Sequence, residues 1–117
     1  MSNHNHTGSI WSNVGDGGVK RHSRPPFNDS TVIGEHLKAG QQLIVLCYAL
    51  HEPTVSFIAA DGHQYQSNAW DFVVTSDQDS VGYVNDVFIN TGGDIRQQLG
   101  NQGTCEVLRQ SLSGGIG

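Results

Sequence analysis

An eight-residue apolar run, LIVLCYAL at positions 43–50, restricts the fold of this chain more than any other segment. Its apolar residues occupy successive positions, so the run does not alternate between a core face and a solvent face. Gly40 and Pro53 bound it, and its length and its β-branched and aromatic content favour a strand over a helix. A strand with this pattern is buried on both faces. The sequence therefore predicts a central strand with the rest of the domain packed around it.

Other strand signals recur about every ten residues, with turn residues between them. They fall at 19–22, 32–39, 55–60, 69–74, 81–84 and 87–89. Turn signals include Gly15 to Gly18 and the pair Asp61-Gly62. This spacing is typical of a small barrel or sandwich, and no alternation of strands with helices indicates a parallel sheet. We expect an all-β fold, with at most one or two helical turns within 94–112.

Length and charge exclude several classes of function. A chain of 117 residues fits one domain and is too short for a barrel enzyme of about 250 residues. Its net charge of -5 argues against nucleic acid as a partner, and no apolar run of about 18 residues predicts insertion in a membrane. The one basic cluster, at 20–24, is interpreted as a solvated loop. No signal-peptide pattern opens the chain, so an exported form would have lost its signal or would leave the cell by lysis, as part of a phage particle.

Several segments, taken in order, carry a family resemblance. They are GVKRHS at 18–23, TVIGEHLKAG at 31–40, LIVLC at 43–47, WDFV at 70–73 and GYVNDVFI at 82–89. Together they resemble the bacterial SH3 (SH3b) domain, in the version appended to secreted cell-wall proteins of actinobacteria. Three features depart from the family pattern: Arg24 to Phe27 replace a Gly-Pro, one extra residue precedes Leu37, and the insert at 51–68 is long. The resemblance implies a small SH3-like barrel at 10–92. The polar residues 1–9 predict a disordered leader, and the shift to Gln, Asn and Gly predicts a C-terminal tail at 93–117 that packs on the barrel.

The resemblance also suggests a role for the two cysteines, Cys47 in the central strand and Cys105 in the tail. In the similar secreted domains a cysteine in this strand often pairs with one after the last strand. We therefore favour a disulfide that tethers the tail and places the protein in an oxidising compartment. The alternative is two reduced cysteines, one of them simply a core residue. A catalytic role for Cys47 is not expected, because its apolar strand would raise the thiol pKa.

No segment predicts a catalytic or metal site, and no cofactor is expected. Counted from Asp77, the acidic loop at 76–80 begins like a calcium loop, but Val81 and Phe88 stand where its fifth and twelfth residues should be ligands. Asp71 and Asp86 are the only carboxylates beside strand aromatics that could pair for glycoside hydrolysis. We interpret them as groups that hold loops or contact a ligand, and we do not expect an enzyme.

The aromatic residues are more informative, because aromatic side chains line the peptide groove of some SH3-like barrels. We predict ligand contacts from Trp70, Tyr83, Asn85 and Asp86, with the aromatic rings stacking and the two polar side chains hydrogen-bonding to the ligand backbone. The alternative for Trp70 and Phe88 is that they fill the core, while Tyr65 and Tyr83 are open to either role.

Two functions follow from these residues and the resemblance. The first is a non-catalytic module that targets or anchors a protein at the cell wall by binding peptidoglycan peptide, outside the cell or at its surface. The second is a structural or interaction protein, such as a phage virion component or a toxin-associated module, that uses the barrel for protein contacts. An open barrel has unpaired edge strands, so a homo-oligomer is also expected.

Overall fold

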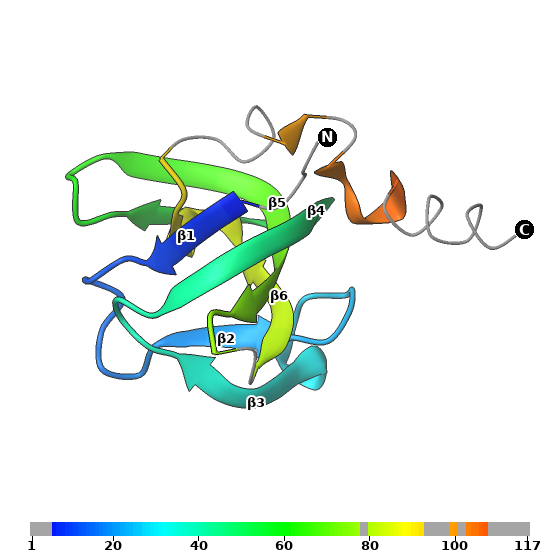
Figure 1. Ribbon diagram of the computed structural model, residues 1–117, viewed down its shortest axis with the longest axis horizontal. Coiled ribbons are helices and arrows are strands. Elements are labelled where there is room, and N and C mark those ends of the chain that lie inside the picture. The colour runs from blue at the N-terminus through cyan, green and yellow to red at the C-terminus, as the bar shows by residue number, and fades with distance from the viewer. Residues whose placement is uncertain (1–5, 78–79, 93–98, 101–102, 108–117) are drawn as a thin grey trace, which may run out of the picture.

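The fold is a single curved antiparallel sheet, described by a computed structural model for residues 6–77, 80–92, 99–100 and 103–107. Seven strands lie in the order β3-β2-β6-β5-β4-β1-β7 (Figure 1). They are β1 His6–Ile10, β2 Val19–His22, β3 Val32–Leu37, β4 Gln42–Ile58, β5 Gln64–Thr75, β6 Val81–Asn85 and β7 Ile89–Asn90, with short 3-10 helices η1 Asp29–Thr31 and η2 Asp86–Phe88. The all-β prediction is confirmed. Because β3 and β7 are the two ends of the sheet and do not pair with each other, the barrel is open.

Strand β4 is the predicted central strand, and it is longer than expected. It pairs with β1 on one side and with β5 on the other. Leu43, Val45 and Tyr48 are buried, whereas Leu50 is 53% exposed. The expected burial on both faces therefore holds only at Cys47 and Tyr48, two successive buried residues just after a register shift, whereas buried and half-buried residues alternate from 43 to 46.

The core lies on the concave side of the sheet and is built from aliphatic residues of nearly every strand. Val45, Val73 and Val84 have no exposed surface, and they come from the three neighbouring strands β4, β5 and β6. The other members of this cluster are Ile10, Val19, Leu37, Leu43, Tyr48, Ala69, Ile89 and Leu99. Contributions from β1 and from Leu99 show that segments at both ends of the chain complete the core.

The basic segment at 20–24 is not a uniformly solvated loop, which corrects that expectation. Arg21 and His22 belong to β2 and are each 7% exposed. The Arg21 guanidinium donates hydrogen bonds to the carbonyl oxygens of Glu35, in β3, and Val81, in β6. Gly34 makes room for it, since a Cβ at this position, where φ is +60°, would overlap the guanidinium. Arg21 thus links β2 to both of its neighbours, β3 and β6, at one end of the sheet.

The expected leader at 1–9 is wrong for its last residues. Residues 6–10 form β1, which pairs with β4 from His6↔Val45 to Ser9↔Gln42 and with β7 at Ser9 and Ile10. Backbone hydrogen bonds join Ile10 N–H to the Gln41 carbonyl and Gly40 N–H to the Ile10 carbonyl. The remainder of the leader, 1–5, lies outside the described residues.

The long insert forms a β-hairpin that extends β4 and β5 beyond the core. Pairing continues from Val55↔Ser67 to Ile58↔Gln64, and the Asp61-Gly62 turn joins the two arms as predicted. In Figure 1 the hairpin, drawn in green, runs beside β1 and the yellow segment that contains η2 and β7. The hairpin therefore supplies one wall of any site formed beside these elements.

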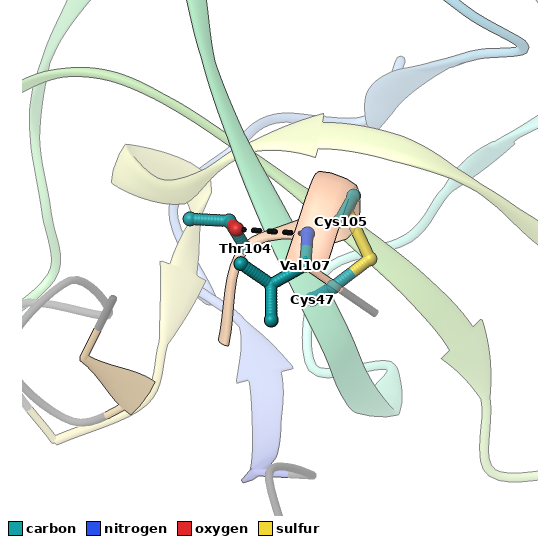
Figure 2. The surroundings of a disulfide bond; sticks show 4 residues. All are labelled: Cys47, Thr104, Cys105 and Val107. Carbon is teal, nitrogen blue, oxygen red and sulfur yellow. Dashed lines mark hydrogen bonds between the residues drawn. A yellow bond between two sulfur atoms is a disulfide. The ribbon is translucent and has the colours of Figure 1, made fainter. Parts of the chain in front are cut away.

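The tail is tethered to the central strand. Cys47 and Cys105 form a disulfide with their Cα atoms 4.8 Å apart (Figure 2). Beside it the Thr104 hydroxyl accepts a hydrogen bond from Val107 N–H, and the Tyr48 hydroxyl donates one to the Gly100 carbonyl. The predicted disulfide and tethered tail are confirmed. Among the described residues no helix is long and apolar enough to cross a membrane.

Replacing Cys47 and Cys105 together by alanine should lower the free energy of unfolding by about 4 kcal/mol, because the disulfide restricts the unfolded chain across a separation of 58 residues. Urea denaturation of the wild type and the double variant measures the difference. The wild type in reducing buffer is the control and should unfold at the same urea concentration as the variant. Identical midpoints for oxidised and reduced wild type would contradict the prediction.

Candidate ligand-binding groove

A groove of about 250 Å³ lies between the β4–β5 hairpin, the residue that follows β1, and the segment 86–92 that contains η2 and β7. Its walls combine aromatic, acidic and amide or hydroxyl side chains. The lining residues are Trp11, Asp61, Tyr65, Gln66, Ser67, Asp86, Val87, Ile89, Asn90, Thr91 and Gly92. Residues far apart in sequence therefore meet only because the hairpin runs beside β1 and β7.

Two half-buried aromatic rings form one wall of the groove. The rings of Trp11 and Tyr65 stack with their centroids 6.1 Å apart and their planes inclined by 24°. Trp11 is held from the other side by its backbone N–H, which donates to the Phe88 carbonyl at 3.1 Å. Asn13 Nδ2 donates to the Ile58 carbonyl at 2.8 Å and ties the segment after Trp11 to the hairpin. The stacked pair is thus anchored at both of its members.

An acidic turn lies at the end of this wall. The Tyr65 hydroxyl donates to Asp61 Oδ2 at 2.5 Å, and His63 N–H donates to Asp61 Oδ1 at 2.9 Å. The hydrogen bond from Tyr65, followed by that from His63, lowers the pKa of Asp61 below its ordinary value. The same bond raises the pKa of Tyr65. Asp61 is therefore ionised and Tyr65 neutral at neutral pH, which gives the groove a fixed negative charge.

The segment 85–92 forms another wall, in which polar side chains are hydrogen-bonded to the backbone. Asn85 donates from Nδ2 to the Ser67 carbonyl, while its Oδ1 accepts from Val87 N–H. These two hydrogen bonds join β5 to the start of η2. Asn90 Oδ1 accepts from Gly92 N–H at 3.3 Å. This wall lines the groove with amide and hydroxyl side chains, among them Asn90 and Thr91.

Of the four predicted contact residues, only Asp86 lies in the groove lining. The expected contact of Asp86 with a ligand stays a prediction. Trp70 and Asn85 are only 5% and 1% exposed, so neither offers a ligand appreciable surface in this structure. Tyr83 is half-buried and packs against Phe27 and Phe72, away from the residues that line the groove. Asp71 is fully buried and, unlike Asp86, is not among the residues that line the groove.

Trp70 and Tyr83 instead belong to an aromatic cluster on the convex face of β5 and β6. Phe27 covers it, stacking on Trp70 with ring centroids 4.3 Å apart and planes at 17°. Trp70 Nε1 donates to the carbonyl oxygens of His51 and Pro53. The segment 24–27 therefore positions Phe27 as the cover of a second, smaller core.

His22 closes this cluster at the side of β2. Its ring meets Trp70 edge-on at 5.4 Å, and Nδ1 lies 3.1 Å from the Thr31 hydroxyl oxygen. Burial is the main cause that lowers the pKa of His22 below its ordinary 6.5. The folded protein therefore favours the neutral imidazole among the aromatic rings.

Acidification should destabilise the protein through His22. The folded-state pKa is depressed, so the unfolded chain binds the proton first, and stability is lost as the pH falls through about 6.5 toward the lowered folded-state value. Urea midpoints at pH 7.5 and pH 5 measure the loss, which should shrink in His22→Gln. His36→Gln, which removes an exposed histidine from the neighbouring strand, is measured alongside as the control substitution. An unchanged pH dependence in His22→Gln would contradict this assignment.

Sequence reasoning missed Trp11 and Asp61 as members of a site and left the role of Tyr65 open. Trp11 lies just after the predicted leader, and only the pairing of β1 with β4 and β7 brings it to the hairpin. The signal for the acidic turn was present, since Asp61 opens a turn four residues before Tyr65. The local sequence pattern could not predict that this turn and Trp11 lie close together in the fold.

No family model matches the chain, and neither the curated proteins nor the solved structures compared with it include a similar one. Among the described residues no group of three or more histidine, cysteine or acidic side chains could hold a metal ion.

Trp70 should contribute more to the free energy of unfolding than Trp11 does. Trp70→Ala should lower the free energy of unfolding by about 3 to 5 kcal/mol, because it empties a buried site beneath Phe27. Trp11→Ala removes a half-buried ring at the groove and should cost much less. Denaturation of both variants under one set of conditions compares them. Equal losses would show that Trp11 is as much a core residue as Trp70.

Proposed function

We propose that this protein is a non-catalytic binding module that recognises an extended polar ligand, the peptide of bacterial peptidoglycan, in the Trp11–Tyr65 groove. The observation that carries the proposal is the joining of a stacked aromatic pair to carboxylate, amide and hydroxyl groups in one cavity. Aromatic rings bind ligands over a large area with few rotatable bonds, and the polar groups orient a peptide backbone.

The form of the groove favours binding over catalysis. Its described lining contains neither cysteine nor histidine, so no nucleophile there is paired with an imidazole base. Asp61 already accepts hydrogen bonds from Tyr65 and His63, which keeps it ionised rather than poised near neutral pH for proton transfer. These features suit a ligand that is held and released unchanged.

The setting of the module is proposed from the sequence resemblance to SH3b domains together with the disulfide. Disulfides persist in oxidising compartments, so Cys47–Cys105 is compatible with a protein outside the cell or at its surface. In that setting the module would target or anchor its bearer at the cell wall.

A second function, that of a structural or interaction protein, has one observation in its favour. The convex face of β5 and β6 carries Phe72 and Val74, which are half-buried, beside Val81, which is 45% exposed. Apolar groups on neighbouring strands can support contact with another protein, as in a virion or a toxin-associated assembly. This function would use the convex face rather than the groove.

Sedimentation with purified bacterial cell walls tests the proposed function. The wild type should pellet with the walls, and Trp11→Ala should weaken binding by about ten-fold or more, because it removes half of the stacked pair. Leu50→Ala removes an exposed apolar side chain outside the groove and is the matched control, expected to bind as the wild type does. Wild-type protein that stays in the supernatant would reject wall binding and leave the interaction function in its place.

A further inference from the structure

The charge of the groove is one-sided. Asp61 and Asp86 lie in its lining, and the described lining includes no lysine or arginine. The charge of the whole chain, -5, adds to the negative potential there rather than opposing it. A ligand that brings a carboxylate into this groove meets repulsion, whereas a ligand that brings a cation meets attraction at short range.

Asp61 is well placed to receive such a cation. A carboxylate can accept about four hydrogen bonds, and the described partners of Asp61, which are the Tyr65 hydroxyl and His63, leave its two oxygens with capacity for a further donor. The Tyr65 bond keeps the group ionised, so its charge persists when the solution is moderately acidic.

The aromatic wall adds a second attraction for the same kind of group. The faces of indole and phenol rings attract cations, and indole is the stronger of the two. The rings of Trp11 and Tyr65 stack at the groove, and the Tyr65 hydroxyl also donates a hydrogen bond to Asp61. A cation in the groove can therefore contact a ring face and a carboxylate at once.

We infer that the groove selects a ligand with a primary ammonium group, seated between the Trp11–Tyr65 rings and the carboxylate of Asp61. This inference rests on the proposed function and names the chemistry of the part of a wall peptide that the groove takes. The ammonium could belong to the side chain of a diamino acid or to a free peptide N-terminus. An ammonium also donates three hydrogen bonds, which matches a wall rich in acceptor oxygens.

The two tryptophans make a direct measurement feasible. Each supplies one indole N–H signal in a nitrogen-15 NMR spectrum of the full chain, Trp11 at the groove and Trp70 in the buried cluster. The first probe is the tripeptide glycyl-lysyl-glycine with acetylated N-terminus and amidated C-terminus. It should shift the Trp11 signal and leave the Trp70 signal in place, so Trp70 is an internal control.

Three further probes separate the chemistry. The same peptide with an acetylated lysine side chain keeps the shape but loses the cation, and should bind at least ten-fold more weakly. The peptide with glutamate in place of lysine should produce no shift at Trp11. Triglycine amide, with a free N-terminus, reports whether an α-ammonium serves as well as a side-chain one. Raising the salt concentration should weaken binding of the lysyl probe and leave binding of its acetylated form unchanged.

Asp61→Asn should reduce affinity for the lysyl probe by about ten-fold, with little effect on the acetylated probe, because the substitution removes the charge and keeps the size. Asp16→Asn changes the net charge equally in an exposed loop outside the groove lining and should have no effect. Equal binding of the lysyl and acetylated probes, or no shift of Trp11 with any ammonium probe, would overturn the inference. Walls that pellet the protein despite such a result would leave the proposed function standing.

Discussion

The pairing of β4 with β5 is the constraint on which the rest of the structure depends. It begins at Leu43↔Thr75 and ends at Ile58↔Gln64, with register shifts after Val45 and after Leu50. In the first part of the pair, alternate residues of β5 face the core, as Val73 does, or the convex cluster, as Trp70 does. A slip by one residue would exchange these two sets, so the register determines which side chains enter the main core and which enter the aromatic cluster. In its second part the same pair becomes the hairpin that forms a wall of the groove.

The two aromatic groups on this frame differ in how their polar atoms are satisfied. The indole nitrogen of Trp70 donates to two carbonyl oxygens, and Phe27 covers the ring. Tyr65 bonds instead to a carboxylate at an exposed turn, and its ring lies beside a cavity. A buried ring whose nitrogen already has partners stabilises the fold, whereas a ring at a cavity beside charged acceptors is available to a ligand. This contrast, rather than aromatic character alone, distinguishes structural from binding residues.

The sequence indicated the elements better than it indicated the site. The central strand, the turn at Asp61-Gly62 and the link from Cys47 to Cys105 were predictable, because local pattern or the family resemblance carried each of them. The groove was not, since it requires Trp11 to lie beside Tyr65, 54 positions along the chain. Trp70 was placed in the site because an aromatic residue in a strand has the same pattern whether it faces a ligand or a second core. Only the loop that carries Phe27 decides between these, and the conformation of a loop with two successive prolines has no periodic signal.

The hydrogen bond between Tyr65 and Asp61 then bears more on function than on stability. It lies at an exposed turn, where a single hydrogen bond contributes little to folding because water competes for both groups. Its geometric effect is larger. Tyr65 is joined to Trp11 through its ring and to Asp61 through its hydroxyl, so the aromatic face and the negative charge lie next to each other at the groove. The same tyrosine therefore sets both the shape and the charge that a ligand would meet.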